Sequence, residues 1–512
     1  MGEAVQGTTV RTSDHVNEPA STILDIHTLN NSPTPTQDSA YKNKKPFQLE
    51  SPKKETIVSV QEECSEGMGK NNAKRKEIPD AWLPITASKN GNAFYSAFHS
   101  VNSGIGFQAL VLPFAFSIIG WTWGIICMLV AFGWQYYTKW LLIQLHESVP
   151  GRRFNRYLQL VKVAFGETPG KLLGLFPVMY LAGGSCVMLI INAGVSMKLF
   201  IKTICGDTCK SPPLTTVECY LMFICLAIIL TQVPSLNSIA WFSFIGGMTA
   251  VLYCTLLWTI PLSKSRPTGI SFDTAKSQSG ISSPFDTFTA IGIIVFAFRG
   301  HNLVLEIQAT LPSSEKYPSR APMWKGVNFA YPIIVMCLFP LALAGYWAYG
   351  NKIPATGMLI ALHSIHKNDT SRFLLGLTSL LVVIHSLTAF QIYSIPILDN
   401  LEFAYTSKKN KPCPMLIHAG FRVFFGCLTC FIAVAIPFIK VLAAIIGSVA
   451  LLLTFAYPCF IWIAIKKPKR FSAMWCINMV LGSLGVVLSI LVFAGCIRSV
   501  THTGIQVGFF KP

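Results

Sequence analysis

The segment that decides the fold reads Ala297-Phe-Arg-Gly-His-Asn-Leu-Val-Leu-Glu-Ile-Gln-Ala-Thr-Leu-Pro312. It belongs to an apolar stretch, residues 286–311, yet it places Arg299, His301 and Glu306 within eight residues. About 20 apolar residues are enough for a helix to cross a hydrocarbon core about 30 Å thick. Ionisable side chains at that depth are rare and usually functional. The segment therefore predicts a membrane helix that is interrupted near its middle by a polar cluster.

A second interrupted stretch reads Ala97-Phe-His-Ser-Val-Asn-Ser-Gly-Ile-Gly-Phe-Gln-Ala-Leu-Val-Leu-Pro113. It contains four poor helix formers close together: Asn102, Ser103, Gly104 and Gly106. Glycines also allow helices to pack closely, so this stretch alone leaves a packing role open. The ionisable cluster in the first segment favours function, because transporters expose polar groups at mid-membrane by interrupting helices.

The composition agrees with a membrane protein. Hydrophobic residues make up 52% of the 512 residues and charged residues 12%, about half the charged share of soluble domains. Residues 1–91 hold 11 Lys and Arg against 12 Asp and Glu, whereas the rest of the chain holds 30 against 11. These cations lie at the edges of long uncharged stretches, as in membrane proteins. The pattern argues against a soluble enzyme, a nucleic-acid-binding protein and a secreted disulfide-rich protein.

Eleven apolar stretches of spanning length follow the first 91 residues. They cover residues 92–119, 121–145, 172–200, 216–233, 236–260, 286–311, 326–348, 372–398, 416–437, 440–465 and 473–496. Because the bilayer core has no water to satisfy the backbone, such spans must be helices. We expect an all-α integral membrane protein with a transmembrane domain over residues 92–512. Residues 1–91 are polar and lack apolar periodicity, which predicts a disordered tail.

An odd number of spans puts the two chain ends on opposite sides of the membrane, and the basic residues indicate which. With a cytosolic N-terminus, the inward connections hold 15 Lys and Arg and the outward ones 10. Two further marks then fall outside: the Cys205/Cys209 loop, where an oxidising compartment would permit a disulfide, and a glycosylation sequon at Asn368. We predict a cytosolic tail and an extracellular C-terminus.

Four motifs carry a family resemblance. Residues 298–312 form the longest of them. The others are Tyr95-Ser-Ala-Phe-His99 with Leu112-Pro-Phe114, then Gly345-Tyr-Trp-Ala-Tyr-Gly350, and Phe455-Ala-Tyr-Pro458. In this order they resemble the sixth-, first-, seventh- and tenth-helix signatures of the plant amino acid/auxin permease family. The resemblance covers the chain from about residue 80 to its end, and the closest branch is that of the lysine–histidine transporter-like proteins.

The resemblance implies the fold of the bacterial leucine transporter, with two inverted repeats of five helices around a central site and one extra helix. It also implies proton-coupled uptake of amino acids at the plasma membrane. The unwound part of the first helix then falls on Asn102 to Gly106, and that of the sixth on Phe298 to Asn302.

Two departures from the family pattern mean that the resemblance does not identify the substrate. Phe107 and Gln108 follow Gly106 where the family has small residues, and Arg299 replaces a small residue of the sixth helix. Both changes fall at the expected pocket. A carrier of another small carboxylate, such as auxin, is therefore an alternative, as is an amino acid receptor of the same fold that does not transport.

The predicted substrate site combines the two interruptions. The N–H groups of Gly104, Ile105 and Gly106 would begin the outer half of the first helix, and a helix N-terminus suits an α-carboxylate. Carbonyl groups freed near Phe98 and Phe298 would bind the α-ammonium. The full set of predicted substrate ligands is Asn102, Ser103, Gly104, Ile105, Gly106, Phe298, Arg299, Gly300 and His301. A glycine kink without a ligand is the alternative.

Glu306 and His301 are the candidates for proton coupling. A carboxyl group shielded from water can load and release a proton near neutral pH, and histidine does so naturally. Arg299 lies seven residues before Glu306, so an intact helix would put both on one face. An ion pair between them is favoured over a pair of Arg299 with a substrate carboxylate, because an unpaired buried Arg is costly.

The remaining polar residues are expected to have structural roles. Four cations near span ends should reach the headgroups: Lys139, Lys198, Arg372 and Arg422. His99 and His385 should make contacts between helices. No Cys/His spacing matches a zinc site and no nucleophile–base motif appears, so neither metal, cofactor nor enzymatic activity is expected. The expected partners are an amino acid, a proton and the lipid bilayer, and not a nucleic acid.

Overall fold

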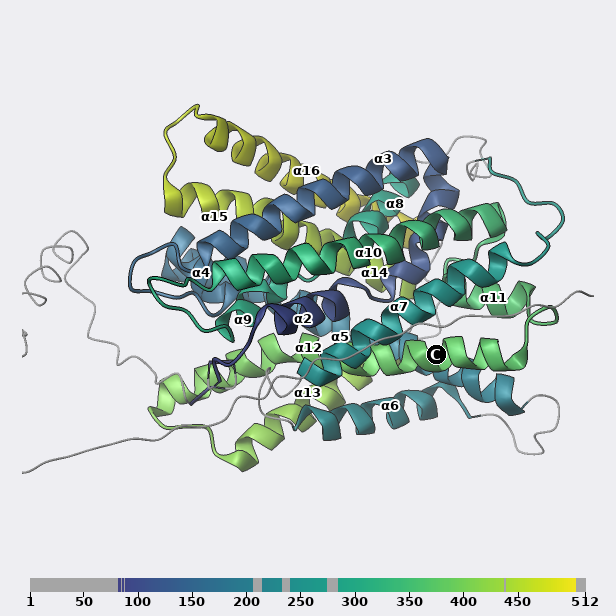
Figure 1. Cartoon of the computed structure of the whole chain (residues 1–512), viewed down its shortest axis with the longest axis horizontal. Coiled ribbons are helices and arrows are strands. Elements are labelled where there is room, and N and C mark those ends of the chain that lie inside the picture. Colours follow the sequence, from purple (N-terminus) through teal and green to yellow (C-terminus); the bar gives the residue numbers. More distant parts are fainter. Residues whose placement is uncertain are drawn as a thin grey trace, which may run out of the picture. The chain divides into compact units, whose positions relative to one another are not determined.

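The computed structural model describes residues 82–83, 85–86, 88–205, 214–232, 240–273, 284–436 and 439–502, without the side chains of residues 439–444, 499–500 and 502. All of these residues belong to one compact unit, Lys76–Pro512. Most of the predicted tail, residues 1–91, lies outside them. The regular elements of the described residues are helices, with no β-strand among them, as predicted for an all-α protein (Figure 1).

The helices are numbered in chain order. They are α2 (Ala93–Gly104), α3 (Gln108–Leu145), α4 (Tyr157–Phe165), α5 (Glu167–Cys205), α6 (Thr216–Thr231), α7 (Ala240–Leu262), α8 (Pro284–Ala297), η3 (His301–Leu303), α9 (Val304–Ala309), α10 (Arg320–Tyr349), η4 (Gly350–Lys352), α11 (Met358–Ile365), α12 (Arg372–Lys409), α13 (Met415–Ala435), α14 (Ile439–Leu451), η5 (Leu452–Ala456), α15 (Tyr457–Lys466) and α16 (Ala473–His502).

Nine segments of the described chain are long and apolar enough to cross a membrane, against the eleven predicted. Two features account for the difference. The helix α3 runs through parts of two predicted spans, 92–119 and 121–145, and only Gly120 interrupts it, with φ 78° and ψ 179°. This backbone conformation suits glycine and bends the helix. The apolar helix α6 has 16 residues and is shorter than the other spans.

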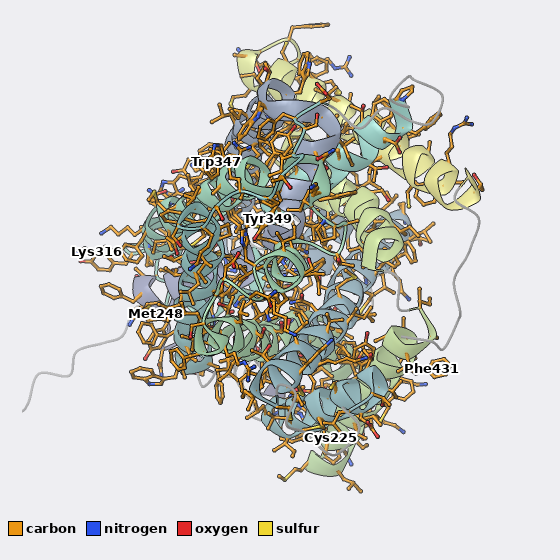
Figure 2. The ribbon with its side chains drawn as sticks, turned by 90° about the vertical axis from the view of Figure 1, so that its right-hand side faces the viewer. Cys225, Met248, Lys316, Trp347, Tyr349 and Phe431 are labelled. Atoms are coloured by element: carbon orange, nitrogen blue, oxygen red, sulfur yellow. The ribbon has the colours of Figure 1, made fainter. Side chains whose placement is uncertain are left out.

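The outer surface of the bundle is apolar. Phe431 is 60% exposed and Met248 48% exposed, and both lie at the periphery together with Cys225, while Tyr349 lies inside (Figure 2). Many other large apolar side chains are exposed as well. A surface of this kind would be unfavourable in water. Hydrocarbon is the solvent that suits this surface.

The interior of the bundle brings together helices that are distant in sequence. The helix α12 packs along α5 and α7, and α10 packs on α2 and α3. Figure 1 shows α3 and α10 side by side. The helix α3 also packs against α8, which precedes the polar cluster. Consequently the first and sixth predicted spans meet inside the bundle.

Candidate functional site

The first interruption separates α2 from α3. The side chain of Asn92 caps the start of α2 by accepting the N–H of Tyr95 at 2.9 Å. The helix ends at Gly104 because Ile105 is extended, with φ −101° and ψ 127°. Within the described chain, the N–H groups of Gly106 and Phe107 donate no hydrogen bond. They are therefore available to an anion at the start of α3.

This interruption is narrower than the predicted one. Asn102, Ser103 and Gly104 belong to the last turn of α2, so the non-helical residues are Ile105 to Phe107. The prediction was too wide because weak helix formers are tolerated where neighbouring helices cover them. A Cβ atom on Gly104 would lie 3.3 Å from Cγ1 of Ile334, which shows that this glycine lets α2 approach α10.

The second interruption lies where it was predicted. The helix α8 ends at Ala297, and a 3₁₀ turn starts at His301. Gly300 has φ 101°, which favours glycine. A Cβ atom there would lie 3.1 Å from Oγ of Ser103 and 3.6 Å from Nζ of Lys139. The structure thus brings the two interruptions into contact.

Polar residues of α3 form hydrogen bonds with the residues around the second interruption. Nε2 of Gln135 donates to the carbonyl of Val295 at 2.6 Å. Nε2 of His301 lies 3.0 Å from the carbonyl of Gln135 and 3.1 Å from Oγ1 of Thr138. The N–H of the neutral imidazole therefore lies on Nε2, and Nδ1 has no hydrogen-bond partner within the described part. Gln135 and Thr138 were not among the predicted site residues, although their three-residue spacing places both on one helix face.

Arg299 lies between the two interruptions and is 3% exposed. Its Cζ is 4.4 Å from the ring centroid of Tyr393 and 5.6 Å from that of Phe107. The hydroxyl of Tyr393 donates to the carbonyl of Ser103 at 2.6 Å. The three guanidinium nitrogens have no hydrogen-bond partner among the described residues. A Cβ atom on Gly106 would lie 2.7 Å from Cζ of Arg299, so the guanidinium group lies against Gly106.

The predicted ion pair between Arg299 and Glu306 is wrong. Oε1 of Glu306 accepts the N–H of Tyr157 at 3.4 Å, and its Oε2 has no hydrogen-bond partner within the described chain. A seven-residue spacing puts two side chains on one face only in an intact helix, whereas the left-handed residue Gly300 changes the chain direction between Arg299 and Glu306. Glu306 is nevertheless buried, at 1% exposure, in α9.

An ion pair that was not predicted lies beside Glu306. The guanidinium of Arg156, the residue before Tyr157, pairs with the carboxylate of Asp399 in α12, and both side chains are buried. Arg156 also lies over the ring of Phe403, at 4.6 Å. No local pattern predicts this pair, because Asp399 directly follows the predicted apolar span 372–398 and resembles an ordinary span boundary.

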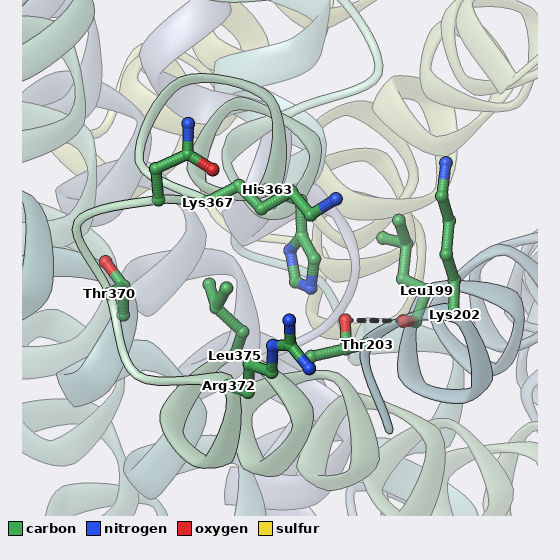
Figure 3. A pocket seen from close by; sticks show the side chains of 9 residues that line it. Leu199, Lys202, Thr203, His363, Lys367, Thr370, Arg372 and Leu375 are labelled. Atoms are coloured by element: carbon green, nitrogen blue, oxygen red, sulfur yellow. Dashed lines mark hydrogen bonds between the residues drawn. The ribbon is translucent and has the colours of Figure 1, made fainter. Parts of the chain in front are cut away.

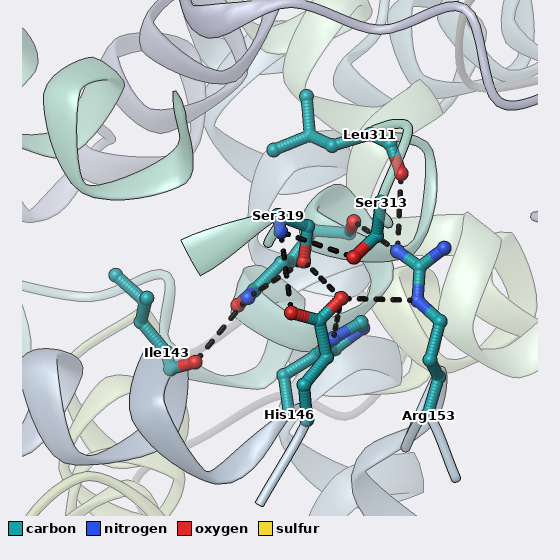
Figure 4. Close-up of polar contacts among 8 residues, drawn as sticks. Ile143, His146, Arg153, Leu311, Ser313 and Ser319 are labelled. Atoms are coloured by element: carbon teal, nitrogen blue, oxygen red, sulfur yellow. Dashed lines mark hydrogen bonds and ion pairs between the residues drawn. The ribbon is translucent and has the colours of Figure 1, made fainter. Parts of the chain in front are cut away.

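A polar network connects the residues that follow α3 with α9 and the start of α10 (Figure 4). Glu147 accepts the hydroxyl of Ser319 at 2.7 Å and pairs with Arg153 at 3.3 Å. Gln308 donates to Ser319 at 3.1 Å. Burial, and then the neighbouring Arg153, hold the pKa of His146 well below its usual value, so His146 stays neutral. The network joins α3, α9 and α10 at one end.

Three of the cations that were expected to reach the lipid headgroups contact other parts of the protein instead. Lys139 is buried, at 2% exposure, with Nζ 5.0 Å from the ring centroid of Tyr331. Arg422 is also buried and pairs with Glu402 at 2.7 Å. Neither reaches the headgroups, because neighbouring helices cover both side chains. Lys198 is partly buried and donates to Thr216 at 2.9 Å.

The other predicted site residues are buried in contacts between helices. Oδ1 of Asn102 accepts the hydroxyl of Thr388 at 3.4 Å. As expected, two histidines contact other helices: His99 lies 2.7 Å from Oγ of Ser243, and Nδ1 of His385 lies 3.0 Å from the carbonyl of Gly246. Ile105 and Phe298 are buried. Among the described residues, no three His, Cys, Asp or Glu side chains group as a metal site would require.

The end of α5 and Asn368 line one pocket. A pocket of about 370 Å³ is lined by Thr203, near the end of α5, and by Asn368 (Figure 3). Lys202, Lys367 and Arg372 also line it.

Cys205, the last residue of α5, is disulfide-bonded. Its predicted partner, Cys209, lies outside the described residues. Asn368 is exposed. The sequon therefore lies on an accessible surface close to the end of α5.

Comparisons with known proteins agree with this architecture. Residues 89–499 match the family described as transmembrane amino acid transporter protein. The chain is 52% identical to lysine histidine transporter-like 8 of Arabidopsis thaliana, over 85% of this chain and 83% of that protein. It is 43% identical to lysine histidine transporter-like 7 of the same plant, over 86% and 92%.

A solved structure shares the fold. The crystal structure of MhsT in complex with L-phenylalanine aligns with a TM-score of 0.51 at 13% identity, over 80% of this chain and 99% of that chain. The interrupted helices thus occur in a leucine-transporter-type fold. The family matches also indicate a transporter and not an enzyme. With a family match over most of its length and relatives of this identity, the chain belongs to the transmembrane amino acid transporter family.

Proposed function

We propose that the protein is a secondary active transporter that carries amino acids into the cell across the plasma membrane together with protons. The observation that carries the proposal is the contact between two helix interruptions deep in the bundle, at Ser103 and Gly300. Such a contact places unpaired backbone groups where a small zwitterion can bind them. The membership of a transporter family and the transporter-like fold support the same function.

We propose eleven spans for the membrane domain. Dividing α3 at Gly120 adds one span to the nine long segments, because α2 and the first part of α3 then form one interrupted helix and the rest of α3 a second. The apolar helix α6 is the other addition. Ten of these helices would form the two inverted repeats of five, and α16 would be the extra one.

The substrate carboxylate would bind the N–H groups at the start of α3. The N–H groups of Gly106 and Phe107 have no other acceptor in the described chain, and the helix dipole adds a partial positive charge there. The α-ammonium would bind carbonyl groups at the end of α8, near Phe298. Ser103, Ile105, Gly300 and His301 would form the walls of this site.

Glu306 would carry the coupled proton, with His301 as the alternative carrier. The side chain of Glu306 is buried and free of Arg299, and one of its oxygens has no partner in the described chain. A carboxyl group in such surroundings binds a proton far more readily than one in water. The Nδ1 atom of His301 has no hydrogen-bond partner either in the described residues, so it could accept a proton.

The coupling energy is adequate. One proton entering down about 150 mV gains roughly 3.5 kcal/mol, and two pH units add roughly 2.7 kcal/mol. Together these support accumulation of a neutral substrate above about 10³-fold. We place the N-terminus in the cytosol, because the outward loops then contain Cys205 and Asn368.

Uptake of labelled amino acids by cells that express the protein tests the proposal. Uptake should rise as the external pH falls and collapse when a protonophore is added. If uptake responds to neither treatment, proton coupling is wrong. Binding of amino acids by the purified protein without uptake would instead indicate a receptor.

A further inference from the structure

Arg299 is a buried cation that forms neither a hydrogen bond nor an ion pair within the described part of the chain. None of its three guanidinium nitrogens has a hydrogen-bond partner in the described chain, and its side chain is 3% exposed. The ring of Tyr393 offers a cation–π contact at 4.4 Å but accepts no hydrogen bond from it. A guanidinium remains charged at any working pH. This arrangement is unfavourable unless an anion binds the group.

The chain offers no such anion in its described part. Each buried carboxylate faces other groups: Glu306 the N–H of Tyr157, Asp399 the guanidinium of Arg156, and Glu402 the side chains of Arg422 and His418. None of them lies within 4 Å of Arg299. The anion that balances Arg299 must therefore come from outside the described chain.

Arg299 adjoins a second anion-binding feature. A Cβ atom on Gly106 would lie 2.7 Å from Cζ of Arg299, so the guanidinium lies against Gly106, where the free N–H groups of Gly106 and Phe107 precede α3. These amides and the positive end of the α3 dipole suit one carboxylate. Lys139 adds a buried ammonium beside Gly300, and no carboxylate pairs with it in the described chain. A ligand with a single carboxylate would balance only part of this charge.

The pocket near the end of α5 has the same charge. Lys202, Lys367 and Arg372 line it, and neither Asp nor Glu does so (Figure 3). A cationic pocket raises the local concentration of anionic ligands. Two separate regions of the described chain therefore favour an anionic substrate.

We infer that the substrate site prefers amino acids with a second carboxylate, and that Arg299 binds that carboxylate. This inference rests on the proposed function and names its substrate class. The start of α3 receives the α-carboxylate, and the guanidinium receives the side-chain carboxylate. A planar guanidinium can form two parallel hydrogen bonds to a carboxylate, which an ammonium group cannot.

Binding to the purified full-length protein tests this inference without relying on transport. Isothermal titration calorimetry compares L-aspartate with L-asparagine and L-glutamate with L-glutamine, since the members of each pair differ only in the side-chain carboxylate. We expect the acid of at least one pair to bind about tenfold tighter or more than its amide. Arg299→Gln should remove that preference while the affinity for the amides stays within about threefold.

Two further variants sharpen the result. Arg299→Lys keeps the charge but loses the planar fork, so it should recover only part of the preference. Arg320→Gln is the matched control, because Arg320 is exposed at the start of α10, and it should bind like the wild type. Because the guanidinium of Arg299 has no hydrogen-bond partner and no ion-pair partner among the described residues, Arg299→Gln without ligand should melt at the same temperature as the wild type or higher.

Three results would overturn the inference. The wild type could bind acids and amides equally. Arg299→Gln could weaken acids and amides to the same extent, which would make Arg299 a ligand of the α-carboxylate that they share. Arg299→Gln could also lower the melting temperature sharply, which would give the residue a structural role. Failure of the proposed function is a separate outcome: amino acids bind with the predicted preference, but labelled substrate does not enter cells.

Discussion

The guanidinium of Arg156 and the carboxylate of Asp399 form a buried ion pair that joins the residue before α4 to α12. The two side chains are 4% and 1% exposed. Tyr157, the next residue, donates its N–H to Glu306 in α9. The pair therefore fixes the backbone that contacts the proposed proton carrier.

Asp399→Asn should destabilise the protein strongly. It leaves the charge of Arg156 buried and uncompensated, and breaking a buried pair in this way costs about 3–5 kcal/mol. Thermal unfolding of the purified protein in detergent measures the loss. The exposed pair of Lys162 and Glu167, with exposures of 23% and 67%, provides the control. Glu167→Gln should cost about 0–1 kcal/mol, and equal losses in the two variants would contradict the prediction.

The sequence was sufficient to predict the fold class and the position of the second interruption. The apolar stretches required membrane helices, and Gly300 between Arg299 and His301 marked the break that the structure has. The number of spans was less certain, because a single glycine, Gly120, separates two of them and the helix continues through it. Local composition thus predicts elements better than it predicts where one ends and the next begins.

The sequence could not predict which side chains pair with one another, for physical reasons. The pair of Arg299 with Glu306 was inferred from helical spacing, which fails once Gly300 adopts a positive φ. Lys139 and Arg422 were assigned to the headgroups from their positions near span ends, yet both are covered by other helices. Asp399 pairs with Arg156 across 243 residues of sequence. Contacts of this kind depend on packing, and no local pattern encodes them.

Glu306→Gln should make amino acid uptake independent of external pH, because the amide cannot bind and release a proton. The side chain keeps its size and can still accept the N–H of Tyr157, so expression should not fall. Uptake measured across a range of external pH values checks this. His301→Gln tests the alternative carrier in the same assay.

His146→Gln is the control for this experiment. Burial and Arg153 keep the pKa of His146 well below its usual value, so it is neutral over the working range and the variant should retain the pH profile of the wild type. A flat profile in His301→Gln, together with a normal profile in Glu306→Gln, would transfer the coupling role to His301.

The loop that contains Asn368 should be extracellular. A membrane-impermeant maleimide should therefore label Lys367→Cys on intact cells, because this exposed residue precedes the sequon. Lys411→Cys, after α12, should be labelled only once the cells are permeabilised. Asn368→Gln should also remove a glycan and increase the mobility of the protein on a gel. The reverse labelling pattern would invert the proposed topology.

Gly106→Val should weaken substrate binding at least about tenfold, or about 1.4 kcal/mol, without preventing insertion. The added atoms would displace the guanidinium of Arg299 and the amide of Gln108, which are the ends of flexible side chains, so the fold can adjust while the site cannot. Gly133→Val is the matched control, because no atom lies within 4 Å of a Cβ built there. Combining Gly106→Val with Arg299→Ala should recover part of the binding of L-asparagine but not that of L-aspartate, since part of the space returns without the guanidinium. Normal affinity in Gly106→Val would show that the interruption between α2 and α3 has only a structural role.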